Sequence, residues 1–358
     1  MPPPLPSGDP TLDLPFAHGG PVLSGNLRST PDDFIVEEEL GYEASGAGEH
    51  VFLKVRKRER NTHEVARAIA KLAGVPQMAV GYAGLKDRSA VTTQHFTVQL
   101  PGRDSPDWSV LEDETLQILS AGRHHRKIRR GGLRGNQFVI RIRQVEGDRA
   151  QAEHRMRQIT QAGVPNYFGS QRFGRDGQNL IQADDLFAGR GRRPNRELRG
   201  LLLSAARGQL FNLVLQARLL NGCWDRPVDG DVMSLSGSQR QFMFDPDDAT
   251  IAPRVAQLDV HPTGPLYGRP GRALRPGARA REIEDHALED WADWMADLAR
   301  LGLDADRRQL RLAAGGLDWR WGDDALELRF DLAAGAYATT VLREIVRASD
   351  PRGGVGLS

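Results

Sequence analysis

The sequence predicts an α+β protein in which strand-rich flanks surround a helix-rich middle. Alternating apolar residues mark strands before residue 163 and again after 309, whereas helical spacing dominates much of the region between them. The length of 358 residues allows two domains or one large domain. We therefore expect one domain formed by 1–162 and 313–358, interrupted by an inserted domain at 163–312.

The first flank reads as several strands around a polar loop. Asn61, with Glu64 three residues later, forms a capping-box-like helix start, and Gly74 ends that helix. The polar stretch 85–94, LKDRSAVTTQ, is a loop held between two strands and behind this helix, a place where chemistry tends to sit. A second helix is expected at 151–161. Alternation predicts strands at 34–38, 51–55, 80–84, 95–100 and 138–143.

The middle and the second flank complete this pattern. Helical spacing predicts helices at 196–222 and 282–301, with the tryptophans of the latter in the core rather than stacking on a ligand. Strands return from Gln309, and a last helix is expected at 337–347. Residues 1–20 are rich in proline and glycine and are expected to be irregular.

Composition is that of an ordinary globular protein, with 39% apolar and 27% charged residues. The net charge of +1 carries no global nucleic-acid signature, so evidence for such a partner must be local. The sequence shows neither a signal peptide nor ~20 consecutive apolar residues, which predicts a cytoplasmic protein without a membrane partner. The single cysteine, Cys223, fits a reducing compartment and is expected to be a small apolar filler.

Metal and nucleotide cofactors are poorly supported. The nine histidines do not fall in metalloprotease spacing, and the adjacent His124 and His125 point in different directions on a regular element. The chain has no Walker A sequence and no Gly-x-Gly-x-x-Gly after a strand. A Ser-His-Asp triad stays open on composition, but no GxSxG elbow supports one. We expect neither a metal nor a cofactor.

A cluster of cations stands out against the neutral overall charge. These cations either lie on a solvated loop or form a surface that binds the phosphates of a nucleic-acid backbone, and we predict the latter. A second group, of aromatic residues and arginines at 167–175, either stacks on bases or packs a turn. We include Arg172 of this group among the RNA-binding residues. The cluster consists of Arg123, Arg126, Lys127, Arg129, Arg130 and Arg134.

Asp87 stands between Lys86 and Arg88 in the polar loop. Two flanking cations favour the charged form of its carboxyl group, whose reference pKa of about 3.9 makes it anionic at neutral pH. Taken alone, such a triplet is most often exposed loop surface. The sequence around the triplet is what assigns it a function.

Five segments, spread over nearly the whole chain, resemble the TruD family of pseudouridine synthases. The loop motif GYAGLKDRSAVTTQ is long and specific, and the other four occur in the family's order. They are TPDDFIVEEEL at 30–40, GYAGLKDRSAVTTQ at 81–94, GNQF at 135–138, VPNYFGSQRFGRDGQN at 164–179 and GAYATTVLREI at 335–345.

The resemblance implies a fold and a reaction. Residues 1–162 and 313–358 would form the pseudouridine synthase catalytic domain, with a mixed, mainly antiparallel sheet in permuted order. Residues 163–312 would form the family's inserted α/β domain, with RNA bound in the cleft between the two. The implied reaction is isomerisation of the uridine at position 13 of transfer RNA. Separately, no exposed apolar helix in the sequence demands a partner, so we expect a monomer with no protein partner.

The resemblance also implies roles for single residues. Asp87 would be the catalytic aspartate, Phe138 the stacking aromatic, and Asn136 would place the nucleotide or Asp87. Arg28, where lysine is also usual, would pair with the aspartate. The loop adds Lys86, Arg88 and Gln94 to the substrate-binding set. The alternative function is a non-catalytic RNA-binding or RNA-folding protein on the same scaffold, which needs no carboxylate at 87.

Overall fold

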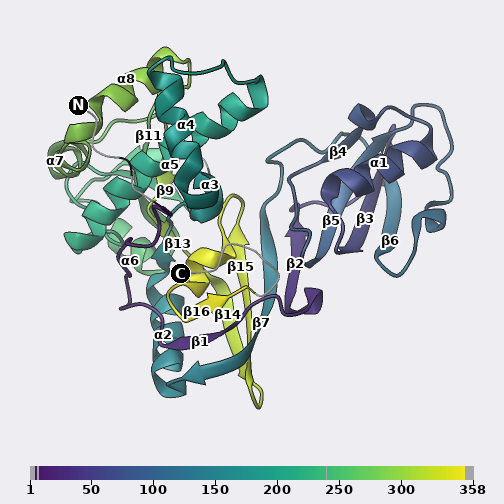
Figure 1. Cartoon of the computed structure of the whole chain (residues 1–358), viewed down its shortest axis with the longest axis horizontal. Coiled ribbons are helices and arrows are strands. Elements are labelled where there is room, and N and C mark those ends of the chain that lie inside the picture. Colours follow the sequence, from purple (N-terminus) through teal and green to yellow (C-terminus); the bar gives the residue numbers. More distant parts are fainter. Residues whose placement is uncertain (1–4, 6–7, 239, 351–358) are drawn as a thin grey trace.

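The computed structural model describes residue 5 and the ranges 8–238 and 240–350. Figure 1 shows a helix-rich body, a long sheet below it and a separate lobe to the right. The strands β2 (Phe34–Glu39) and β7 (Gly135–Gly147) connect this lobe to the rest. Within the described residues no helix is both long and apolar enough to cross a membrane. Short 3-10 helices join the main elements: η1 (Pro31–Asp33), η2 (Gln77–Ala79), η3 (Trp108–Leu111), η4 (Arg175–Gly177) and η5 (Glu289–Trp291).

A mixed, mainly antiparallel sheet runs through the long sheet and the lobe, as predicted. Its two parallel pairs are β2 with β5 (Val91–Gln99), and β1 (Leu23–Asn26) with β16 (Val346–Ser349). Strands from the end of the chain therefore complete a sheet begun by its first residues. The path is β14 (Gly315–Trp321), β15 (Ala325–Ala333), β7 (Gly135–Gly147), β2 (Phe34–Glu39), β5 (Val91–Gln99), β3 (His50–Arg58) and β6 (Leu116–His124), with β4 (Val80–Tyr82) on β5.

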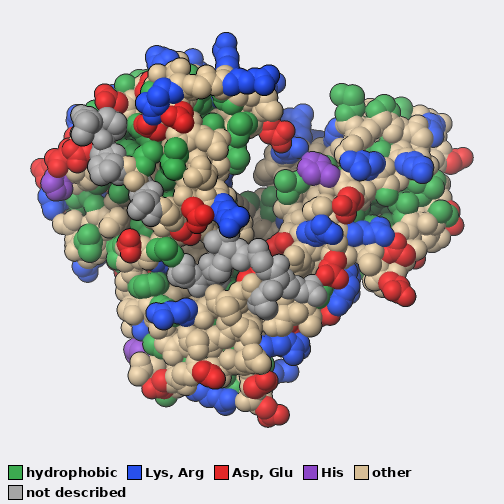
Figure 2. Space-filling model, viewed as in Figure 1, with side chains coloured by type: hydrophobic (Ala, Val, Ile, Leu, Met, Phe, Trp, Pro, Cys, Tyr) green, Lys and Arg blue, Asp and Glu red, His purple; other side chains and the backbone are tan. Residues whose placement is uncertain are grey.

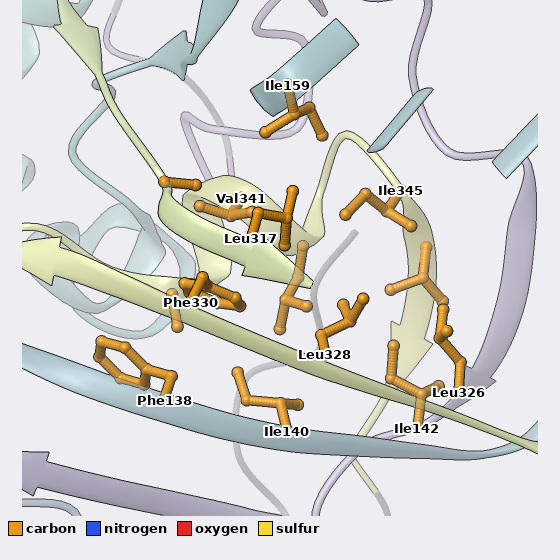
Figure 3. Packing of buried hydrophobic residues seen from close by; sticks show 14 of the residues in the cluster. Phe138, Ile140, Ile142, Ile159, Leu317, Leu326, Leu328, Phe330, Val341 and Ile345 are labelled. Carbon is orange, nitrogen blue, oxygen red and sulfur yellow. The ribbon is translucent and has the colours of Figure 1, made fainter. Parts of the chain in front are cut away.

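The long sheet buries one face against two helices. Inward residues of β7 and β15 alternate with exposed ones, so each strand presents an apolar row (Figure 3). The helices α2 (Arg149–Ala162) and α9 (Ala338–Leu342) cover this face through residues such as Ile159 and Val341. The apolar row contains Phe138, Ile140, Ile142, Leu326, Leu328 and Phe330.

The lobe on the right of Figure 1 packs α1 (Thr62–Ala73) on β3, β4, β5 and β6 around its own apolar core. Asn61 and Glu64 form both hydrogen bonds of the capping box, and Gly74 ends the helix with φ 60°. The predicted start and end of this helix are confirmed. β5 begins at Val91 rather than 95, so the polar loop is shorter than expected, at 83–90.

The helix-rich body has a separate core formed mainly by α4 (Gln178–Phe187), α5 (Arg196–Leu220) and α8 (Ala292–Arg300). The antiparallel ribbon of β8 (Val164–Pro165) and β13 (Arg311–Leu312) pairs residues next to positions 163 and 312, where the domain boundaries stay a prediction. Cys223 is buried, as expected. The helices are α3 (Ser170–Phe173), α4 (Gln178–Phe187), α5 (Arg196–Leu220), α6 (Ile251–Ala256), α7 (Ala278–Ala287) and α8 (Ala292–Arg300). The small sheet has the order β10 (Gln241–Met243), β9 (Val232–Leu235), β11 (Val260–Leu266) and β12 (Asp306–Gln309).

Two predicted helices differ from the structure. The helix expected at 282–301 is broken between α7 and α8, because Leu288 leaves the helical region with φ −122° and ψ 14°. Trp291 and Trp294 then pack edge to face at 4.9 Å in the core, which confirms the role predicted for the tryptophans. The last helix ends at Leu342 instead of 347, because Val346–Ser349 pairs with β1 as a strand.

Candidate active site

Asp87 lies on the loop 83–90 between β4 and β5, with 36% of its side chain exposed. Its Oδ2 is 2.9 Å from Nη2 of Arg28, and its Oδ1 accepts a hydrogen bond from the backbone N–H of Ser89 at 3.0 Å. Both carboxylate oxygens thus have a donor while the group stays accessible. Such a carboxylate is oriented and within reach of a ligand, which suits a nucleophile or a base.

Arg28 is held on three sides. Its Nη1 is 3.1 Å from Oδ2 of Asp350, and its guanidinium carbon lies 4.3 Å from the centre of the Phe34 ring. Its backbone adopts φ 53°, a left-handed conformation that costs a non-glycine residue roughly 1–2 kcal/mol. Strain of this kind tends to persist at functional sites, where the surroundings determine the conformation. The structure therefore brings Arg28 and Asp87 together, as the resemblance implied.

Gln94 supports the loop from beneath. Its side chain is buried, its Nε2 donates to the carbonyl of Gly84 at 2.6 Å, and its Oε1 accepts the hydroxyl of Thr62 at 3.0 Å. The same hydroxyl oxygen accepts the N–H of Lys86 at 3.0 Å. The expectation that Gln94 contacts substrate is therefore corrected, because both ends of its amide are used inside the protein.

Lys86 turns inward instead of lying beside the Asp87 carboxylate. Its ammonium donates to Oδ1 of Asn136 and lies 3.4 Å from Oε1 of the fully buried Glu38. Oε2 of Glu38 also accepts the backbone N–H of His95 at 2.8 Å. Burial alone would raise the pKa of Glu38, but the hydrogen bonds from His95 and the charge of Lys86 outweigh it and hold this pKa below its usual value. Lys86 and Asn136 thus bind each other and anchor the loop to β2 and β7.

Replacing Glu38 with glutamine should destabilise the fold by about 3 kcal/mol, because it leaves the buried Lys86 ammonium uncompensated. Thermal and urea unfolding measure this loss. Since the folded-state pKa of Glu38 is lowered, its contribution is present above its ordinary pKa and is lost as the pH falls through the folded value. The variant should therefore lose stability less steeply with acid than the natural protein.

Glu37 offers a matched control on the same strand. Its carboxylate is 40% exposed and 3.6 Å from Arg56, so Glu37→Gln should change stability by no more than about 0.5 kcal/mol. Equal losses for the two variants would show that the buried contact with Lys86 contributes nothing special.

Phe138 is part of the sheet core and is only 7% exposed. Its ring stacks on that of Phe330 (Figure 3), with the ring centres 5.5 Å apart. It also meets the Phe34 ring edge to face at 6.2 Å. Because Arg28 covers Phe34, Phe138 is one ring away from the Arg28–Asp87 pair. Arg88, the other predicted loop residue, is exposed at the surface.

The basic segment, residues 123–134, is fixed beside the Asp87 loop by its backbone. The N–H of Gly131 donates to the carbonyl of Ala83 at 2.7 Å, and that of Ile128 donates to Oγ1 of Thr97 at 2.9 Å. With its backbone fixed, this segment presents its cations to solvent. The exposed ones are Arg126, Lys127, Arg129, Arg130 and Arg134.

Three predicted RNA-binding residues make contacts inside the protein. Arg123 donates to the carbonyls of Leu100 and Arg103. Arg172 donates to Oγ of Ser204 at 2.8 Å and to the hydroxyl of Tyr337 at 2.9 Å. Both guanidinium groups thus connect parts of the fold, and their contact with RNA stays a prediction. Lys127 donates to the carbonyl of Met78 but remains exposed.

The aromatic set near Arg172 packs rather than offering stacking faces. Tyr167, Phe168 and Phe173 are all buried in the core of the helix-rich body. Of the two interpretations of this segment, the packed turn is the one that the structure shows.

A cleft lies between the basic segment and the helix-rich body. Arg134 lines it on one side and Arg308 and Asn166 on the other. The guanidinium of Arg308 lies 4.3 Å from the centre of the Phe168 ring, and burial lowers its pKa to about 10, which leaves it charged at neutral pH. Figure 2 shows a hollow between the lobe and the body, with Lys and Arg side chains on both of its sides. The arrangement suits a polyanion.

Three supporting residues were missed from sequence. Glu38 and Lys57 occupy inward positions of strands whose other inward residues are mainly apolar, and this alternation was the signal that could have revealed them. Asp350, which is 4% exposed beside Arg28, had no such signal.

A family model described as tRNA pseudouridine synthase D (TruD) matches residues 15–184 and 178–345. The chain belongs to the TruD family of tRNA pseudouridine synthases. This membership makes the protein an isomerase, and it confirms the family that the five motifs indicated.

Similar proteins cover almost the whole chain. A tRNA pseudouridine synthase D from Methylococcus capsulatus is 49% identical over 95% of this chain and 96% of its own length. Another, from Nitrosococcus oceani, is 47% identical over 94% of this chain and 95% of its own length. The crystal structure of a putative TruD from Methanosarcina mazei matches with a TM-score of 0.69 at 21% identity, over 94% of this chain and 97% of that one. That likeness confirms the fold predicted from the TruD motifs.

Proposed function

We propose that the protein converts the uridine at position 13 of transfer RNA to pseudouridine, and that Asp87 carries out the chemistry. The observation that supports this most is the Arg28–Asp87 pair, an accessible carboxylate held 2.9 Å from a strained arginine in a TruD chain. A non-catalytic RNA-binding protein has no physical need for such a pair. The proposal takes the enzyme to be a cytoplasmic monomer.

The reaction breaks the bond between C1′ and N1, turns the uracil, and joins C1′ to C5. The proton on C5 leaves, N1 gains a proton, and no electrons enter or leave overall, so the reaction needs no redox cofactor. Asp87 either attacks C1′ or C6 as a nucleophile, or removes the C2′ proton to give a glycal. In either route Arg28 keeps the carboxylate oriented until the uridine arrives.

The target uridine has to leave its stack before Asp87 can reach it, at a cost of a few kcal/mol. A contact between the uracil and Phe138, which is 7% exposed, would offset part of this cost, since base–aromatic stacking contributes roughly 1–3 kcal/mol. Phosphate contacts from the exposed arginines of the basic segment, which lies beside the loop, would contribute the rest.

The target position is tested with a transfer RNA transcript labelled with tritium at C5 of uridine, because pseudouridine formation releases that tritium. We expect release from the natural transcript and none above background when position 13 carries cytidine. Equal release from both transcripts would contradict the proposed position while leaving the synthase activity intact.

Changing Arg129 and Arg130 to serine should weaken transfer RNA binding and flatten its salt dependence. For each phosphate that the variant no longer neutralises, the slope of log Kd against log salt should fall by about one unit. Arg67 and Lys71, on the exposed face of α1 in the same lobe, provide a control pair whose replacement should leave the slope unchanged. An unaltered slope in the Arg129/Arg130 variant would show that these charges are only solvated.

A further inference from the structure

Lys57 is a buried lysine whose ammonium ends directly behind the Asp87 loop. Its side chain is 1% exposed, and Nζ donates to the carbonyl of Asp87 at 3.0 Å and to that of Arg60 at 2.7 Å. A charge without water is costly unless it is hydrogen-bonded and compensated. The two carbonyls supply the hydrogen bonds, and the negative charge of Asp87 supplies compensation.

The position itself does not call for a lysine. Val51, Leu53 and Val55 are the preceding inward residues of β3, and all three are buried and apolar. An apolar side chain at 57 would continue this row and avoid the cost of a buried charge. The lysine therefore needs a reason other than packing, and its ammonium contacts the backbone of Asp87, whose carboxylate pairs with Arg28 and remains accessible.

We propose that Lys57 is a positioning residue for Asp87, and that its ammonium both fixes the Asp87 backbone and places a positive charge behind the carboxylate. This inference rests on the proposed function of Asp87. Arg28 holds the carboxylate from the front, and Lys57 holds the same residue through its carbonyl. Rotation of the Asp87 backbone, which would turn the carboxylate away from Arg28, would break the bond to Lys57.

The contact to Arg60 joins the loop to the start of α1. Arg60 precedes Asn61, the N-cap of α1, and the first helical residue, Thr62, accepts the N–H of Lys86. Lys57 and Thr62 thus connect two consecutive loop residues to one helix end. A small displacement of this end would pass directly to Asp87, and misplacing a reacting group by about 1 Å can slow catalysis about a hundredfold.

The first test compares Lys57→Met with a control, Lys54→Met. Lys54 is a half-exposed lysine on the same strand. We expect Lys57→Met to lower kcat about a hundredfold while KM and the Kd for transfer RNA stay within about twofold. Lys54→Met should leave all three within about twofold. A normal kcat in folded Lys57→Met would overturn the proposal, as would an equal loss in both variants.

The second test uses pH and does not depend on how Lys57→Met folds. Burial is the main reason that the pKa of Lys57 is lowered to about 8. The negative charges of Asp87 and Glu64 raise this pKa, and the positive charge of Lys86 lowers it, and the value of about 8 includes all of these effects. Natural enzyme should therefore lose kcat above about pH 8, whereas Lys57→Arg, which keeps its proton, should retain its plateau. Coinciding profiles would overturn the proposal.

Asp87→Asn separates this inference from the proposed function. If natural enzyme forms pseudouridine, Asp87→Asn is inactive and Lys57→Met is fully active, only the role of Lys57 fails. If Asp87→Asn retains activity, the proposed function of Asp87 fails, and the positioning role fails with it.

Discussion

Asp87→Asn should lower the single-turnover rate of pseudouridine formation by at least about a thousandfold and leave the Kd for transfer RNA within about twofold. The amide is neutral, so it neither attacks a carbon effectively nor removes a proton, whereas phosphate contacts from the basic segment are unaffected. Tritium release with enzyme in excess measures the rate, and filter binding measures the Kd.

Asp113 provides a matched control for this substitution. It too is a half-exposed aspartate that pairs with an arginine, Arg60, and accepts the N–H two residues ahead, that of Thr115. Asp113→Asn should therefore keep the rate within about twofold. A rate for Asp87→Asn near that of the control would remove Asp87 from the chemistry.

Arg28→Met should lower the same rate about a hundredfold, because the Asp87 carboxylate loses the donor that orients it. Arg28→Lys should lose less, since it keeps the charge but cannot contact Asp87 and Asp350 with two separate nitrogens. We therefore expect the rate to be highest for the natural enzyme, lower for Arg28→Lys and lowest for Arg28→Met. The affinity for transfer RNA should change by a smaller factor than the rate.

Arg58 gives the comparison for Arg28. It pairs with Asp32, but both side chains are more than one third exposed, so Arg58→Met should leave the rate within about twofold. If Arg28→Met retained the natural rate while staying folded, the Arg28–Asp87 pair would have no part in catalysis.

Most of the fold could be predicted from local patterns. The capping box at Asn61 and Glu64, the stop at Gly74 and the alternation in β2 and β7 depend on neighbouring residues and are found in the structure. The errors arose where tertiary packing overrode local spacing. Val346–Ser349 continues a helical pattern but pairs with β1 as a strand, and Leu288 breaks a helix so that Trp291 can pack beside Trp294.

The residues of the site could be predicted where a family motif contained them. The direction in which their side chains point could not be predicted in the same way. Arg28 and Asp87 are far apart in the chain, and no local pattern pairs them, so only the family resemblance could predict that they meet. Lys86 and Gln94 have the same polar character as Arg88 in the sequence, but the first two turn inward. Inward direction depends on buried partners such as Glu38, which only the folded chain reveals.

Mass-spectrometric mapping of pseudouridine in an unmodified transfer RNA transcript, incubated with the purified protein, tests the central claim most directly. We expect pseudouridine at position 13 with the natural chain and an unchanged uridine there with Asp87→Asn. Pseudouridine at position 13 with both proteins, or with neither, would contradict the claim that the Asp87 carboxylate performs this reaction.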